Sequence, residues 1–164
     1  MEAILRSIAQ IYPDEVAAIR GELAGLSPVP SAIVPVELWN GERLNDYLRD
    51  IDGRIAGGNF EGAITLCYSC LEGFFKAFLK RNVPDYAGSG EILDASKAIK
   101  KHLRGSLVSY PDEALGMVVQ IAHTIDRARN GFSESHFDER AARWLAVFVR
   151  DLTNSTIRLL LHFL

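Results

Sequence analysis

The segment FEGAITLCYSCLEGFFKAFLKR, residues 60–81, decides the fold class. Its apolar side chains recur at intervals of three and four residues, the spacing of one buried face of an α-helix. Asn59, directly before it, belongs to the residue types that cap helix N-termini. The segment therefore predicts a long helix with these residues turned inward: Ile64, Cys67, Leu71, Phe74, Phe75, Phe78 and Leu79.

Four further segments show the same helical spacing. They are residues 41–58, residues 91–103, the stretch that Pro111 opens with Asp112 and Glu113, and residues 137–163. No segment alternates as a strand does, and no internal repeat occurs. The sequence thus predicts an all-α antiparallel bundle of about four main helices. Outside the first segment, the predicted inward residues are Leu44, Tyr47, Leu48, Ile51, Ile55, Ile92, Ala95, Ile99, Leu103, Leu115, Val118, Ala122, Ile125, Ala141, Leu145, Phe148, Leu152, Leu159 and Phe163.

The N-terminal part differs from the rest in its proline content. Residues 2–26 predict two short helices broken at Pro13, and residues 27–36 predict an extended connector because they hold three prolines in ten positions. The whole chain has 164 residues, a length that suits one domain. We therefore expect residues 1–36 to pack as a short helical extension on the bundle formed by residues 37–164.

Composition excludes several classes of protein. The chain has no uninterrupted apolar run of membrane-spanning length and no signal-peptide pattern at its start, so we expect a soluble cytoplasmic protein without a membrane partner. Cys67 and Cys70 have CxxC spacing, but they lie inside an apolar helix without further ligands, so buried packing is favoured over a metal or redox site. No metal or cofactor is expected. The net charge of −3 means that any attraction to nucleic acid must be local.

The stretch RNGFSESH, residues 129–136, is unusually polar for a connection between two apolar helices. Arg129 lies one step of four beyond Ile125, where the apolar stripe would next be buried, and His136 is predicted to begin the last helix. Ser133 or Ser135 could cap that helix. A neutral imidazole at a helix N-terminus suits acid–base chemistry, and a guanidinium suits a phosphate. The alternative is structural, with Arg129 capping carbonyl groups and His136 filling a turn.

At these residues the sequence resembles a known family. RNGFSESH resembles the R-N-x5-H form of the Rx4-6H motif of the HEPN superfamily. Residues 63–79, with Leu71, Glu72 and Lys76, and residues 127–164 resemble the C-terminal domain of abortive-infection proteins, a likeness that covers roughly residues 44–163. Phe137 departs from the pattern, since related domains often have glycine after the histidine.

The resemblance implies an α-helical bundle that dimerises with two motifs facing each other, and a metal-independent endoribonuclease of toxin or abortive-infection type. It implies that His136 moves the proton of a 2′-hydroxyl or of the leaving 5′-oxygen, that Arg129 stabilises charge on the phosphate, and that Asn130 orients one of these groups. A regulatory or antitoxin protein is the further partner implied. Weaker candidates for binding the RNA substrate are Glu72, Arg127 and Ser133. For Glu72 the spacing favours an exposed ion pair with Lys76, four residues further along the same helix.

Two other interpretations remain open on the sequence. The protein could be a HEPN-type scaffold that binds RNA, a nucleotide or a protein without cutting. It could also be an obligate helical oligomer whose aromatic faces serve only assembly, through Phe74, Phe75, Phe78, Trp144 and Phe148.

Overall fold

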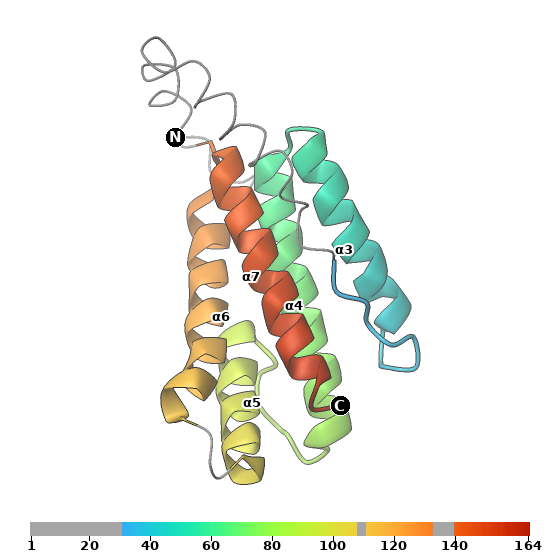
Figure 1. Cartoon of the computed structure of the whole chain (residues 1–164), viewed down its shortest axis with the longest axis vertical. Helices are drawn as coiled ribbons and strands as arrows, with labels where there is room; N and C mark the ends of the chain where they lie inside the picture. Colours follow the sequence, from blue (N-terminus) through green and yellow to red (C-terminus); the bar gives the residue numbers. More distant parts are fainter. Residues whose placement is uncertain (1–30, 108–110, 133–139) are drawn as a thin grey trace, which may run out of the picture. The chain divides into compact units, whose positions relative to one another are not determined.

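The computed structural model describes residues 31–107, 111–132 and 140–164, and these residues form helices without any strand. The predicted all-α bundle is confirmed. The predictions for residues 1–30 lie outside the described residues. With labels as in Figure 1, the helices are α3 (Gly41–Ala56), α4 (Phe60–Asn82), α5 (Ile92–Ser106), α6 (Asp112–Phe132) and α7 (Arg143–Leu161).

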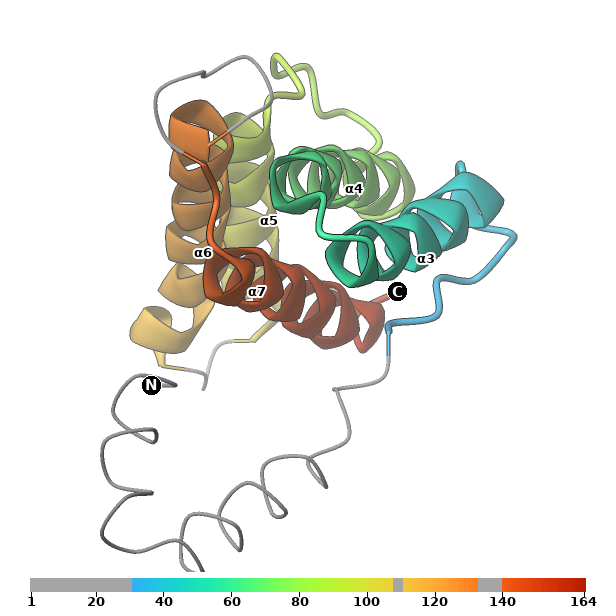
Figure 2. The same ribbon diagram turned by 90° about the horizontal axis from the view of Figure 1, so that it is seen from above.

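Helix α4 is the central helix, because α3, α5, α6 and α7 all contact it (Figure 2). Every inward residue predicted for this helix is buried. The Asn59 side chain caps it by accepting a hydrogen bond of 2.8 Å from the Gly62 N–H. Phe74, Phe75 and Phe78 are fully buried, so an assembly role for these three is wrong. They form the middle of the core instead.

The apolar character of α4 is accounted for by this core. Among the described residues, α4 is the one helix with the length and hydropathy of a membrane span. Of its most apolar 18-residue stretch, 61% is buried inside the bundle. A central helix surrounded by four others must be apolar on nearly all sides. Its composition is therefore explained by packing.

Helices α5 and α6 form an antiparallel pair on one side of α4 (Figures 1 and 2). All the inward residues predicted for them are buried. Asp112 joins the start of α6 to the end of α5 through ion pairs with Lys100 at 3.1 Å and Arg104 at 3.3 Å. Pro111 precedes α6, with its carbonyl accepting from the Ala114 N–H, so it is not the first helical residue as predicted.

The last helix differs from its prediction in its first residue and in two of the six residues predicted to face inward; the other four, Ala141, Leu145, Leu152 and Phe163, are buried or partly buried against the core. Residues 140–142 are not helical and α7 begins at Arg143, because the Ala141 N–H donates to the Glu61 carboxylate at 2.9 Å instead of entering a helical turn. Phe148 and Leu159, predicted inward, are 46% and 37% exposed. The side that packs on the bundle is more polar than expected, and its buried residues are Ala146, Val149, Arg150, Thr153, Asn154, Thr156, Ile157 and Leu160.

Residues 31–36 precede α3 in the chain and lie against the bundle as a non-helical strap, in agreement with the extended connector predicted for that part of the chain. The Asn154 side chain accepts from the Ala32 N–H at 2.7 Å, and the Asn45 side chain both accepts from and donates to the backbone of Val34 at 2.8 Å. Arg150, almost fully buried, forms ion pairs with Asp52 at 2.9 Å and Asp151 at 2.7 Å. It also donates to the hydroxyl of Ser31 in the strap at 3.4 Å, and this hydroxyl donates to Asp52 at 2.8 Å. These polar contacts fix the strap against α3 and α7.

Candidate functional site

Arg129 lies in the last turn of α6, and its side chain is exposed. The prediction that Arg129 occupies a buried position is wrong, since the last buried residue of α6 is Ala128. Helix α6 has 21 residues and its antiparallel neighbour α5 has 15, so the last turns of α6 extend beyond the first turn of α5 (Figure 1). Among the described residues, no helix covers Arg129 there. Helix α6 also continues through Phe132, so the stretch that begins at Arg129 is helical for its first four residues.

The guanidinium of Arg129 contacts an aromatic ring of the central helix. Its carbon lies 4.7 Å from the centroid of the Tyr68 ring. A cation over the face of a tyrosine ring is attracted by the ring's quadrupole, which also orients a long side chain. Because the contact is with the ring face, the N–H donors at the edge of the guanidinium remain for an anion such as a phosphate.

Tyr68 itself is half-buried and surrounded by charge. Burial raises the pKa of its phenol, and the carboxylates of Glu72 and Asp126 raise this pKa further, whereas Arg129 lowers it. Tyr68 therefore stays neutral at physiological pH and offers a ring face and a hydroxyl. It is a functional candidate that the sequence reasoning missed.

Glu72 lies one turn from Tyr68 on α4 and forms the predicted ion pair with Lys76, at 3.3 Å. Both side chains also line a pocket of about 320 Å³ between α3 and α4. Glu72 thus stands between the Tyr68 contact on one side and this pocket on the other. Arg129 contacts the Tyr68 ring, and the charges of Glu72 and Arg129 act on the pKa of Tyr68 in opposite directions.

The remaining candidates are placed less centrally. Asn130 is exposed, and its amide donates to Asp126 at 3.3 Å, one turn earlier on the same helix. Arg127 is exposed on α6 as well. His136 and Ser133 lie outside the described residues. Because α7 begins only at Arg143, the expectation that the last helix starts next to His136 is wrong.

Signals in the sequence could have pointed to Tyr68. Tyr68, Glu72, Lys76 and Lys80 follow one another at four-residue spacing along α4, so they form one polar stripe on an otherwise apolar helix. The residues opposite this stripe across the pocket could not be found in this way. Trp39, Arg43 and Tyr47 come from α3 and the turn before it, and only packing places them there.

Cys67 and Cys70 are fully buried, as predicted. Burial raises the pKa of the Cys67 thiol to about 12 and raises that of Cys70 as well, so neither is a thiolate at physiological pH. Within the described ranges, no group of three or more His, Cys, Asp or Glu side chains has the geometry of a metal site. The CxxC spacing here serves packing of α4 against α3 and α7, through Leu44 and Thr153.

Fold and site define an all-α bundle protein with an exposed arginine–tyrosine pair beside a polar groove. No protein-family model, curated protein or solved structure matches the chain.

Proposed function

We propose that the protein is a metal-independent endoribonuclease of HEPN type that acts in abortive infection or as a toxin in antiviral defence. The observation that carries this proposal is Arg129, an exposed guanidinium seated on the Tyr68 ring in the last turn of α6. Asn130 follows it in the order of the HEPN motif, and His136 stands six residues further along the chain. A cation held in one orientation with free donors suits a phosphodiester.

The reaction proposed is transfer of the phosphate to the neighbouring ribose oxygen. The 2′-oxygen attacks phosphorus while its proton passes to a base, the bond from phosphorus to the 5′-oxygen breaks, and that oxygen receives a proton. His136 acts in these proton transfers, and Arg129 stabilises the charge that develops on the phosphate. The products are a 2′,3′-cyclic phosphate and a 5′-hydroxyl, so DNA is not a substrate.

The proposal includes a homodimer in the cytoplasm and a regulatory or antitoxin protein that restrains the activity. Support for the homodimer comes from α7, where Trp144 is 69% and Phe148 is 46% exposed one turn apart. Two large exposed aromatic side chains on one helix face are typical of an interaction surface. Sedimentation equilibrium of the wild type and of Trp144→Ser would measure whether this face carries a dimer.

The test is cleavage of labelled single-stranded RNA by purified protein in the presence of EDTA. We expect Arg129→Ala and His136→Ala to lose about 100-fold or more of the rate, the size of effect of removing an electrostatic or acid–base group. Two matched variants should retain the rate: Arg49→Ala, an exposed arginine on α3, and His123→Ala, an exposed histidine on α6.

The product ends distinguish this nuclease from a contaminant, since a cyclic phosphate requires the 2′-hydroxyl. If the wild type cuts no faster than Arg129→Ala and His136→Ala, the nuclease proposal is wrong. RNA that is bound by all three proteins but cut by none would favour the non-catalytic binding module.

A further inference from the structure

Three cations of the described residues lie over aromatic rings, and all three pairs border the exposed side of α4. The distances from cation to ring centroid are 5.2, 5.3 and 4.7 Å, respectively, for Arg43 with Tyr47, Lys80 with Trp39, and Arg129 with Tyr68. Arg43, Tyr47 and Trp39 line the groove between α3 and α4, and Lys80 lies over Trp39. The third pair lies beyond Glu72 at the junction with α6. Figure 2 shows this side of α4, which faces away from α7 and lies between α3 and the α5–α6 pair.

We call these residues, with Glu72 and Lys76, the aromatic–basic surface. Tyr68, Glu72, Lys76 and Lys80 form its floor along α4, and Trp39, Arg43 and Tyr47 form its wall on the α3 side. At about 1.5 Å of rise per residue, the floor from Tyr68 to Lys80 is about 18 Å long. That length spans about five nucleotides at the duplex spacing of about 3.4 Å per phosphate, and fewer in an extended strand.

The charge of the surface is opposite to that of the whole chain. It carries the cations of Arg43, Lys76, Lys80 and Arg129. Against these four stand three carboxylates, Glu72, which is paired with Lys76, and Asp126 and Glu91, which act on Tyr68 at one end, so one positive charge is in excess. The chain as a whole has a net charge of −3. A phosphate backbone would therefore be attracted to this surface more than to the rest of the molecule.

The aromatic rings select the kind of nucleic acid. Trp39 is 43% exposed, and Tyr47 and Tyr68 are half-buried, so each presents part of its ring to solvent. Bases of a single strand can stack on such rings, whereas the bases of a duplex are already stacked on each other. Alternating rings and cations along a groove are typical of proteins that bind single strands.

We propose that the aromatic–basic surface binds single-stranded RNA and leads it to Arg129. Bases stack on Trp39 and Tyr47, and phosphates lie against Arg43, Lys76 and Lys80. The identity of the strand as RNA rests on the proposed function. The surface and its single-strand preference rest on the cation–aromatic pairs and on the groove.

The experiment measures fluorescence anisotropy of a labelled single-stranded 2′-O-methyl RNA. This probe cannot be cleaved through its 2′-position, so binding is measured independently of catalysis. We expect Trp39→Ala to raise the Kd about tenfold, the effect of losing one stacked base. Trp39→Phe keeps an aromatic ring and should stay within about twofold of the wild type. Tyr47→Ala removes a ring and also the hydroxyl that accepts hydrogen bonds of 3.0 and 2.6 Å from Arg43, so it should weaken binding at least as much as Trp39→Ala. A duplex of the same sequence should bind more weakly than the single strand.

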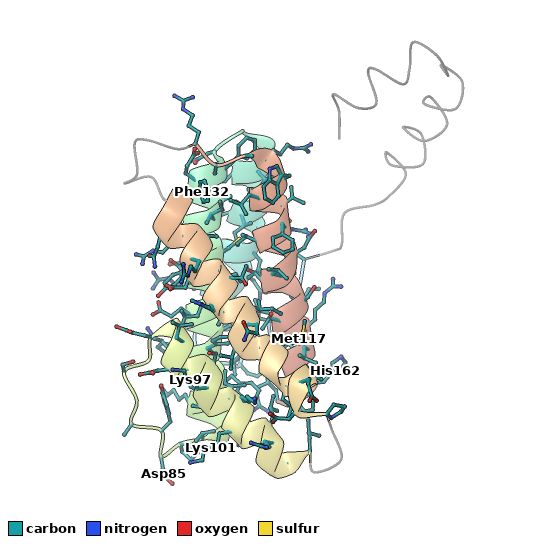
Figure 3. The ribbon with its side chains drawn as sticks, turned by 90° about the vertical axis from the view of Figure 1, so that its left-hand side faces the viewer. Asp85, Lys97, Lys101, Met117, Phe132 and His162 are labelled. Carbon is teal, nitrogen blue, oxygen red and sulfur yellow. The ribbon has the colours of Figure 1, made fainter. Side chains whose placement is uncertain are left out.

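The cations provide a second readout, the slope of log Kd against log salt. Lys80→Ala should reduce this slope by about one, as expected for a lost phosphate contact. Lys101→Ala is the matched control, because this exposed lysine lies on α5, on the side of the molecule shown in Figure 3, away from α3. Circular dichroism of each variant checks that the helices are intact.

The outcomes separate this proposal from the nuclease. If Trp39→Ala and Tyr47→Ala bind within about twofold of the wild type, or if duplex binds as tightly as single strand, the surface is assigned wrongly even where RNA is cut. If these variants lose binding while the wild type cuts no RNA, the surface stands and the nuclease proposal fails. Binding of an unlabelled acidic peptide with equal affinity would show a protein-binding surface and overturn the assignment to RNA.

Discussion

Replacement of Arg150 by alanine tests the polar contacts that fix the strap to the bundle. The Arg150 side chain is 7% exposed, whereas its partners Asp52 and Asp151 are 45% and 41% exposed. Alanine removes two buried methylene groups of the stem beyond Cβ, at about 0.8 kcal/mol each. The two ion pairs add about 0.5–1 kcal/mol each, because the carboxylates left behind can be rehydrated. We therefore expect Arg150→Ala to lower the free energy of unfolding by about 3 kcal/mol.

The assay is urea denaturation followed by helical circular dichroism, with thermal unfolding beside it. For a unit of this size, about 3 kcal/mol corresponds to a Tm lower by about 10 °C. Arg150→Met retains the apolar stem and should cost about half as much as Arg150→Ala. The matched control is Arg49→Ala, which removes an arginine whose ion pair with Asp46 is largely exposed, and which should cost less than about 0.5 kcal/mol.

Two results would refute this reasoning. If Arg150→Ala and Arg49→Ala lower the free energy of unfolding by equal, small amounts, burial of the Arg150 side chain contributes nothing to stability. A loss for Arg150→Met as large as that for Arg150→Ala would mean that the ion pairs, and not the stem, carry the stability.

Three further predictions concern the core and the site. Gly41→Ala should lower the free energy of unfolding by about 2–3 kcal/mol, because its Cβ would overlap the backbone carbonyl of Pro35. Gly53→Ala, which has open space on the same helix, should raise the free energy of unfolding by about 0.5–1 kcal/mol. Urea denaturation of both variants compares them directly. Because the pKa of Cys67 is about 12, alkylation of native protein at pH 8 should be about a thousandfold slower than in denaturant, and rapid native labelling would contradict the buried placement. In a pH titration by NMR, Arg129→Gln should raise the pKa of Tyr68 further and Glu72→Gln should lower it; unchanged values in both would mean that the two side chains do not face the ring. Since the folded pKa of Tyr68 is raised, its contribution to stability is complete below about pH 10, the ordinary value, and is lost as the pH rises through the folded value.

Helical periodicity was sufficient to predict the core helices. The inward faces of α4, α5 and α6 were read correctly because each is a stripe of Leu, Ile, Val, Ala or Phe at three- and four-residue spacing. The same reasoning succeeded only in part for the last helix. Ala141 is buried, and Leu145, Leu152 and Phe163 pack partly buried against the core, but Phe148 and Leu159 are exposed. The buried side also contains Arg150, Thr153 and Asn154, which the pattern did not predict. Asn154 and Arg150 are buried there because they bind the strap and Asp52 of α3, contacts that no local pattern reveals.

For the candidate site, the sequence by itself selected the residues that we propose to carry chemistry: Arg129, Asn130 and His136, and more weakly Glu72, all by their resemblance to a family. Only the tertiary structure decided that Arg129 is exposed and lies on Tyr68, because this depends on α5 being shorter than α6. It also decided that Trp39, Arg43 and Tyr47 face the polar stripe of α4. Periodicity describes the faces of one helix, whereas a site is formed by the relative lengths and positions of several, and these are set by packing across the whole core.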